Sequence, residues 1–388
     1  MTPNSLAKHL FKVYPEYRLD NLNPRNCKHG VIIPLLEDLV VQSDTFLAMK
    51  ELGHSIEGRS INLLSCGIGA RKVLLWSQMH GDESTATLAL MDIFNFLVNH
   101  PSTEKWVQEM LSECSFFFIP MLNPDGSERV QRRTAVDIDM NRDAKALRTP
   151  EARILRDAQR KIGPSFGFNL HDQDLSSVGT SSSVTALALL APAVDDARRN
   201  PRVRMRAMRV AALIAGTLNQ FIEGHVAQYD DAFEPRAFGD AMQGWGTSTV
   251  LIEAGHWPND PEKSFIRKLN FIAILSALRA IGNYSFQDVD LDLYAKLPQN
   301  GKKMFDVIIR DVTLLHPKWS EKVDIGLMRD MKSDTTVVTV KEIGDLSTCG
   351  GLETIDAHAR NLSHSSLGIE KMLPLSNLLD ALQLHYST

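Results

Sequence analysis

The sequence has 388 residues, of which 44% are hydrophobic and 23% charged, as in an ordinary soluble globular protein with one large domain or two. Its formal net charge of −5 argues against nucleic acid as a partner. We expect no membrane association and a cytoplasmic location, because the sequence shows neither an apolar stretch of membrane-spanning length nor the apolar core of an N-terminal signal peptide.

The cysteine pattern gives no sign of a disulfide framework or a cysteine-rich metal site. Four cysteines are scattered along the chain without CxxC or paired spacing: Cys27, Cys66, Cys114 and Cys349. Cys66 and Cys114 lie beside apolar runs. We therefore expect reduced, buried thiols.

Three regions follow one another along the chain. Residues 1–50 are predicted to form a helical lead-in. Strand and helix patterns then alternate over residues 51–287, which indicates an α/β fold with a mixed, mostly parallel central sheet flanked by helices. Residues 288–388 contain short β-rich runs separated by polar turns, and we predict a small β-rich C-terminal domain there.

Helix boundaries within the middle region can be predicted from capping residues. A helix is expected over 85–98, with one apolar face. Thr149 followed by Pro150 is a typical helix start, because the hydroxyl caps the helix and proline fits its first position. The segment 260–262 repeats this pattern, and the helix it starts is expected to end at Gly282.

The most informative feature of the sequence is the segment His80-Gly81-Asp82-Glu83, shortly after the apolar run 73–76. A histidine and a carboxylate three residues apart, near the end of a buried strand, can direct an imidazole and an oxygen toward one point. Such a pair supplies two of the three protein ligands of a catalytic zinc site. The HxxE pattern alone occurs often by chance, so further ligands must support it.

Two more strand ends carry suitable side chains. His171 follows the apolar run 166–170, and Glu253 follows the run 249–252. Both runs have the composition of central strands in a helix-covered sheet. Because ligands bind at the carboxyl ends of strands in open α/β sheets, we expect these residues to lie at one sheet edge with His80 and Glu83.

Between these strand ends lie an Asn-Pro-Asp-Gly turn at 123–126 and the segment Asp139-Met140-Asn141-Arg142. These motifs occur along the chain in the order found in one protein family. The same order includes the segment 53–59, the HxxE segment and the strand-end residues His171 and Glu253. Over roughly residues 50–280 the chain resembles the zinc carboxypeptidases of the carboxypeptidase A type, whose zinc site has two histidines and one glutamate.

This resemblance implies Zn²⁺ as cofactor, bound by His80, Glu83 and His171. It also implies that Asp139 accepts a hydrogen bond from His80 and so fixes the tautomer of that ligand. Asp172, next to His171, is a less certain candidate for a similar task.

The resemblance also implies the catalytic and substrate-binding residues. Glu253 is expected to act as general base and then general acid. Arg132 is expected to stabilise the negative charge that develops on the carbonyl oxygen, with Arg133 as the alternative. Asn141 and Arg142 are expected to bind the C-terminal carboxylate of a peptide, for which a guanidinium offers a bidentate fork.

One departure from the family concerns a mobile tyrosine, usually found about twenty residues before the catalytic glutamate. Residues 237–246 occupy that stretch here and contain no tyrosine, and Tyr229 is not a convincing match. We therefore expect another side chain to close over the substrate, and the sequence does not predict which C-terminal residue is preferred.

The sequence is compatible with three functions. The first is a zinc metallocarboxypeptidase that hydrolyses the C-terminal peptide bond of a peptide. The alternative enzyme is a zinc-dependent N-acyl-amino-acid amidohydrolase of the aspartoacylase and desuccinylase type, which shares the zinc site and often adds a C-terminal β domain. A non-enzymatic binding module is disfavoured because Glu253 is present. The oligomeric state and the role of the C-terminal domain are not predicted.

Overall fold

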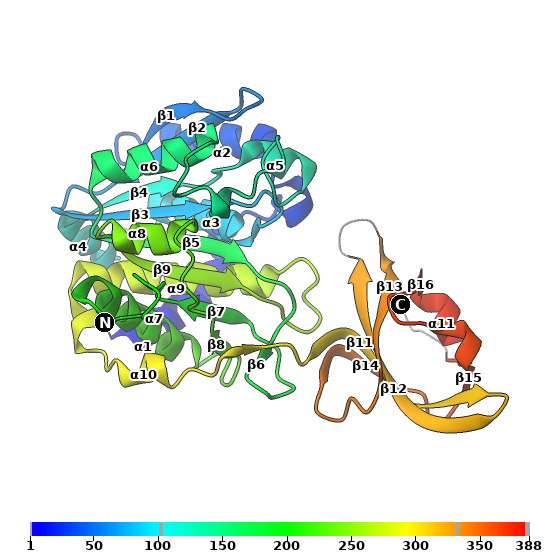
Figure 1. Cartoon of the computed structure of the whole chain (residues 1–388). Coiled ribbons are helices and arrows are strands. Elements are labelled where there is room, and N and C mark those ends of the chain that lie inside the picture. Colours follow the sequence, from blue (N-terminus) through cyan, green and yellow to red (C-terminus); the bar gives the residue numbers. More distant parts are fainter. Residues whose placement is uncertain (1, 101–103, 331–333, 385–388) are drawn as a thin grey trace. The chain divides into compact units, whose positions relative to one another are not determined.

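A computed structural model describes residues 2–100, 104–330 and 334–384 (Figure 1). The chain divides into two compact units. The first unit comprises residues 1–173, 186–255 and 262–299, and the second comprises residues 174–185, 256–261 and 300–388.

The first unit is built on an eight-stranded sheet with the strand order β1-β2-β4-β3-β5-β9-β7-β8. The four neighbouring strands β4, β3, β5 and β9 are parallel, whereas β1/β2, β2/β4 and β7/β9 pair antiparallel. This arrangement confirms the predicted mixed, mostly parallel sheet. The strand bounds are β1 Ala48–His54, β2 Ser60–Cys66, β3 Arg71–Ser77, β4 Cys114–Ile119, β5 Phe166–Asp172, β7 Leu187–Leu190, β8 Val226–Gln228 and β9 Ser248–Ala254.

Helices cover this sheet on both faces, and its central strands are therefore buried along nearly their whole length. On one face, α6 and α8 pack with Trp76 of β3 into a single apolar cluster. On the other, Phe94 of α3 lies edge-on against Phe118 of β4. The helices are α1 Pro3–Tyr17, α2 His29–Gln42, α3 Thr85–Asn99, α4 Lys105–Glu113, α5 Pro124–Arg129, α6 Pro150–Ile162, α7 Arg202–Leu218, α8 Phe238–Gly244, α9 Ser264–Gly282 and α10 Asp292–Ala295.

Two helix starts were predicted from capping residues, and the structure confirms one of them. Helix α6 begins at Pro150 as predicted, and the Thr149 hydroxyl accepts a hydrogen bond from the backbone N–H of Ala152 at 3.2 Å. The predicted start of α9 at 260–262 is wrong, because that helix begins at Ser264. Lys263 has a left-handed backbone with φ 52°, and a right-handed helix cannot run through such a residue.

The second unit contains a six-stranded sheet in the order β14-β11-β12-β13-β16, with β15 also paired to β11. Its apolar residues form a core of their own with helix α11. This sheet confirms the predicted β-rich C-terminal region. A separate two-stranded pair joins β6 and β10. The bounds are β6 Ser177–Val178, β10 Asn300–Gly301, β11 Met304–His316, β12 Trp319–Asp330, β13 Asp334–Gly344, β14 Gly350–Asp356, β15 Asn361–Ser363, β16 Met372–Pro374 and α11 Leu375–Ala381.

The described helices have no transmembrane character. None of them combines the length and the apolar character that crossing a membrane requires.

Candidate metal centre

The loop that follows β3 turns sharply and packs tightly. Gln78, the first residue after the strand, has a left-handed backbone with φ 51°, and this turns the chain toward His80. Gly81 lies against the backbone of Gly126, so that a Cβ atom added to Gly81 would lie 2.0 Å from the Gly126 carbonyl carbon. Only glycine permits this approach, which brings the loop and the Asn-Pro-Asp-Gly turn together.

The Asn-Pro-Asp-Gly turn supports the loop through its first side chain. Asn123 caps α5, where its Oδ1 accepts a hydrogen bond from the Gly126 N–H at 2.9 Å. The Asn123 Nδ2 donates to the carbonyl oxygen of Met79 at 3.2 Å. In the same turn, Asp125 accepts a hydrogen bond from the Ser55 hydroxyl at 2.7 Å. The turn therefore connects the segment 53–59 with the loop that carries the HxxE segment.

A second set of contacts, unforeseen from the sequence, supports the same loop from the N-terminal region. The Gln78 Nε2 donates to the carbonyl oxygen of Gly81 at 3.0 Å and to the Ser127 hydroxyl at 2.9 Å. The Ser127 hydroxyl donates to the carbonyl oxygen of Cys27 at 2.7 Å, and the Cys27 thiol lies 3.6 Å from the Gln78 Oε1. Burial raises the pKa of this thiol to about 12, so Cys27 is a neutral packing residue.

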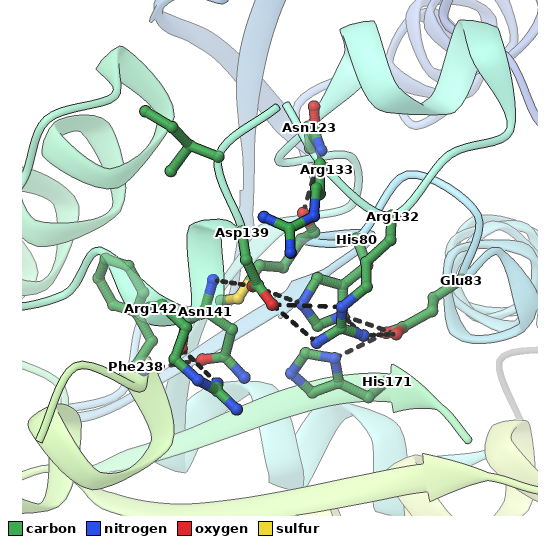
Figure 2. A network of polar contacts seen from close by, with 12 residues as sticks. His80, Glu83, Asn123, Arg132, Arg133, Asp139, Asn141, Arg142, His171 and Phe238 are labelled. Carbon is green, nitrogen blue, oxygen red and sulfur yellow. Dashed lines mark hydrogen bonds and ion pairs between the residues drawn. The ribbon is translucent and has the colours of Figure 1, made fainter. Parts of the chain in front are cut away.

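The three predicted metal ligands converge at the ends of β3 and β5 (Figure 2). The two oxygens of Glu83 lie 2.6 Å from the Nδ1 of His80 and 2.7 Å from the Nδ1 of His171. All three side chains are buried, and their ligand atoms lie within 4.8 Å of one another. Among the described residues, this is the one cluster of three or more histidine, cysteine or acidic side chains spaced for a metal ion.

The outer nitrogen of each histidine has a different environment. The Nε2 of His80 lies 3.2 Å from the Oδ1 of Asp139, as the resemblance implied, and a carboxylate at this place favours the tautomer with its proton on Nε2. The Nε2 of His171 has no hydrogen-bond partner among the described residues. Asp172 does not contact His171 through its side chain, which accepts from the Thr85 hydroxyl at 2.5 Å and from Lys263 at 3.3 Å.

The charges of the cluster favour an ionised Glu83. Burial alone would raise the pKa of the Glu83 carboxyl. The neighbouring His171 and His80 lower it by more than burial raises it, so this pKa lies well below the usual range of a glutamate. Burial likewise opposes ionisation of Asp139, yet its hydrogen bond to His80 and the charge of Arg132 bring its pKa below the ordinary value. Burial lowers the pKa of His171, which favours the neutral imidazole that a metal requires.

Glu253 is the last residue but one of β9 and lies beside this cluster. In the pairing of β5 with β9, Glu253 stands directly opposite His171. It is buried, and its Oε2 has no hydrogen-bond partner among the described residues. Burial raises the pKa of Glu253 well above its usual range, and the nearby carboxylates Glu83 and Asp172 add to the effect.

Arg132 and Arg133 differ clearly in their placement. The Arg132 Nη1 lies 3.2 Å from the Oε1 of Glu83, and its Nη2 and Nε lie 3.1 and 3.3 Å from the Oδ2 of Asp139 (Figure 2). Arg133 instead donates to the carbonyl oxygen of Asp137 at 3.0 Å. The structure thus brings Arg132, and not Arg133, against the candidate metal ligands.

Asn141 and Arg142 lie in a short 3₁₀ turn that Asp139 caps. The Asn141 Oδ1 accepts a hydrogen bond from the N–H of Phe238, the first residue of α8, at 2.9 Å. Arg142 donates to the carbonyl oxygen of Asn141 at 2.8 Å, its Nε lies 3.7 Å from Glu234, and 44% of its side chain remains exposed. Helix α8 lies in the stretch that lacks the family's tyrosine, and its first residue contacts Asn141 directly.

Comparisons with known proteins agree with this geometry. Residues 32–183 match the zinc carboxypeptidase family model, a segment that includes every candidate site residue except Glu253. Carboxypeptidase 2 of Trichophyton rubrum is 25% identical over 144 residues, covering 34% of this chain and 26% of that protein. The match therefore spans about a quarter of the length of this curated relative.

Solved structures show the same fold. A metallo-carboxypeptidase from Burkholderia cenocepacia superposes with a TM-score of 0.52 at 18% identity, covering 65% of this chain and 68% of that chain. Thrombin activatable fibrinolysis inhibitor superposes with a TM-score of 0.56 at 13% identity, covering 73% of this chain and 81% of that chain. The sequence match and the fold together confirm the resemblance that the motifs indicated.

Proposed function

From this relationship to the zinc carboxypeptidase family, we propose that the chain is a metallocarboxypeptidase that hydrolyses the C-terminal peptide bond of a peptide. The observation that carries the proposal is the convergence of two imidazole nitrogens on the carboxylate of Glu83. At the next strand end, the Oε2 of Glu253 has no hydrogen-bond partner among the described residues. Parallel strands β3, β5 and β9 are neighbours, so their carboxyl ends present these groups at one edge.

The donor set fits zinc. Two neutral imidazoles and one carboxylate are the protein ligands of many hydrolytic zinc sites, which keep one further position for water or substrate. When bound, zinc polarises the substrate carbonyl and lowers the pKa of a bound water to about 7. The contact between His80 and Asp139 supports the fit, because a zinc-binding histidine commonly donates its outer N–H to a carboxylate.

Glu253 is the proposed proton carrier. No residue that the structure describes forms a hydrogen bond with its Oε2, so this oxygen can accept a proton from the attacking water and return it to the leaving amine. Burial and the neighbouring carboxylates raise the pKa of the Glu253 carboxyl, which makes its carboxylate a stronger proton acceptor than that of an ordinary glutamate.

Arg132 is the proposed stabiliser of negative charge on the carbonyl oxygen. Its guanidinium is oriented by Asp139, the same carboxylate that contacts His80. The single carboxylate of Asp139 therefore orients both the Arg132 guanidinium and the His80 imidazole. A fixed cation at this point lowers the barrier because it favours the charge that appears only during the reaction.

Asn141 and Arg142 are the proposed binding site for the terminal carboxylate of the substrate. Because the Asn141 Oδ1 already accepts from Phe238, its Nδ2 is the group that remains to donate. The partly exposed guanidinium of Arg142 can add a bidentate contact. Together they would fix the end of the peptide beside the metal ligands.

The second candidate function is N-acyl-amino-acid hydrolysis at the same metal centre. The observation that favours it is the C-terminal β-rich unit, which that branch often carries. The two activities differ in the acyl side of the cleaved bond. Incubation with peptides and with matched N-acyl amino acids, followed by quantification of released amino acid, separates them.

The test of the proposal starts with metal content. Purified protein should bind one zinc per chain, and His171→Ala should lose it, since two protein ligands are too few for tight binding. The zinc-loaded protein should release single residues from the C-terminus of peptides. Full zinc occupancy in His171→Ala, or no release from any peptide, would refute the proposal.

A further inference from the structure

Asp172, the last residue of β5, connects the metal-binding cluster with the opposite face of the sheet. Its backbone N–H donates to the Oε2 of Glu83 at 3.2 Å. Successive side chains of a strand point to opposite faces, so the Asp172 carboxylate lies on the face away from His171. There its Oδ2 accepts from the Thr85 hydroxyl at 2.5 Å and from the Lys263 ammonium at 3.3 Å. One residue therefore holds a proposed metal ligand through its backbone and two other segments through its side chain.

Lys263 extends this connection to the strand that carries Glu253. Its Nζ donates to the carbonyl oxygen of Ala254 at 3.3 Å as well as to Asp172. Ala254 is the last residue of β9, directly after Glu253, and it stands opposite Asp172 in the pairing of β5 with β9. The Lys263 ammonium therefore joins the ends of the two strands that carry His171 and Glu253.

The joined strand ends are also the places where the chain leaves the first unit. The pairing of β5 with β9 stops at Asp172 and Ala254. The segments 174–185 and 256–261, which follow the two strands, belong to the second unit. Lys263 comes directly after the return of the chain to the first unit, so its bond to Ala254 closes the base of the segment 256–261. The ammonium thus holds the strand ends together at the point where the ladder of backbone pairs ends.

The backbone of Lys263 indicates a specific role for its side chain. Its φ of 52° lies in the left-handed region, which is unfavourable for a residue with a Cβ atom. Lys263 is the N-cap residue of α9, yet its side chain makes no capping hydrogen bond to that helix. Such a conformation persists only where the surrounding structure fixes it, and strained residues of this kind gather at functional sites. The side chains of Lys263 and Asp172 are only 16% and 12% exposed, so water screens their contact little.

From these contacts we infer that Lys263 is a positioning residue that fixes Glu253 relative to the metal ligands. The inference rests on the proposed function, in which Glu253 exchanges a proton with groups at the metal centre. Lys263 acts through Ala254, which follows Glu253, and through Asp172, which follows His171 and donates to Glu83. The rate is sensitive to such positions, since a displacement of about 1 Å can cost about 100-fold.

Lys263→Met tests this role, because methionine nearly keeps the length of the side chain and removes the ammonium. In zinc-loaded protein, kcat for peptide hydrolysis should fall at least about 10-fold, whereas KM should change less than about 2-fold. The variant should still hold one zinc per chain, measured by metal analysis. Lys263→Arg should keep most of the activity, since a guanidinium can donate to both Asp172 and Ala254. A merely structural role would lower the melting temperature without this separation of kcat from KM.

Two further variants make the result specific. Thr85→Val removes the other donor to Asp172 at nearly constant size, so it should lower kcat in the same way even if Lys263→Met does not fold. Lys268→Met is the matched control, because it removes the same charge near the start of α9. The Lys268 ammonium lies 3.3 Å from the centre of the Phe11 ring, and its loss should leave kcat unchanged.

The outcomes separate this inference from the proposed function. An unchanged kcat in Lys263→Met, or in Thr85→Val where Lys263→Met does not fold, would overturn the inference and leave the proposed function intact. An equal loss of kcat in Lys268→Met would overturn it as well. If the unmodified protein cleaves no peptide, the proposed function fails, and the visible absorption of cobalt-substituted protein, which reports the arrangement of the ligands, decides on Lys263. A band shift in Lys263→Met that is absent from Lys263→Arg and Lys268→Met would support the positioning role, whereas identical spectra would overturn it.

Discussion

Removing the charge of Asp139 should weaken metal binding without removing a ligand. Its Oδ1 contacts the Nε2 of His80 at 3.2 Å, and its Oδ2 accepts from the Nη2 of Arg132 at 3.1 Å. Asp139→Asn keeps the size of the side chain and an oxygen that can accept from His80. It removes the negative charge that favours the Nε2–H tautomer and fixes the arginine.

The expected size of this effect follows from the contact to His80. Loss of such an outer partner of a metal ligand typically costs 10- to 100-fold in metal affinity, about 1.4–2.8 kcal/mol. Zinc affinity measured by competition with a chelator gives the number directly. A loss of peptidase activity at saturating zinc should accompany it, because Arg132 loses its orientation as well.

Asp137→Asn is the matched control. It removes the same charge from the same loop, but 90% of the Asp137 side chain is exposed and its carboxylate lies 3.7 Å from Arg133 rather than near a ligand. Asparagine also tolerates the left-handed backbone of that position, where φ is 61°. If Asp139→Asn and Asp137→Asn change the zinc affinity equally, then Asp139 does not act through His80.

Two other substitutions test parts of the site. Arg142→Ala should raise KM for peptides with a free C-terminal carboxylate at least about 10-fold, with little change for the corresponding amides. Equal changes in KM for the peptides and the amides, measured by steady-state kinetics, would show that Arg142 does not bind the carboxylate. Gln78→Ala should lower the melting temperature and the zinc affinity, since it removes hydrogen bonds to Gly81 and Ser127 worth about 1–3 kcal/mol together. Unchanged values of both quantities would show that these hydrogen bonds do not fix the loop.

The central strands could be predicted because their sequences are locally unambiguous. The runs that became β3, β4, β5 and β9 are short, apolar and rich in β-branched or aromatic residues, and they are bounded by polar segments. Because ligands bind at the carboxyl ends of strands in such sheets, the residues at these strand ends, His80, Glu83, His171 and Glu253, were predicted to share an edge. The structure brings the first three together and pairs Glu253 with His171.

Features that depend on tertiary contacts could not be predicted. Arg132 and Arg133 are neighbours of the same type, and only the position of Asp139 and Glu83 distinguishes them. The start of α9 is displaced because Lys263 adopts a left-handed backbone that its sequence does not signal. The pairing of Ser177–Val178 with Asn300–Gly301 joins distant segments through two residues each, too few for a local pattern.

One feature was within reach of sequence reasoning but was missed. Asp172 directly follows His171 at the end of the strand, and alternation alone places the two side chains on opposite faces of the sheet, which excludes the contact considered for this pair. Gln78 gave no such signal, because a left-handed glutamine between a strand and a metal-binding loop is recognisable only from its backbone angles.

The most direct test of the account is turnover by zinc-loaded Glu253→Gln. The substitution keeps the size of the side chain and removes the proton acceptor, and Glu253 is not among the three converging ligand residues. We predict full zinc content, retained peptide binding and a decrease in kcat of at least about 100-fold, the lower end of what general acid–base catalysis contributes. Turnover near that of the unmodified protein, with zinc retained, would contradict the account.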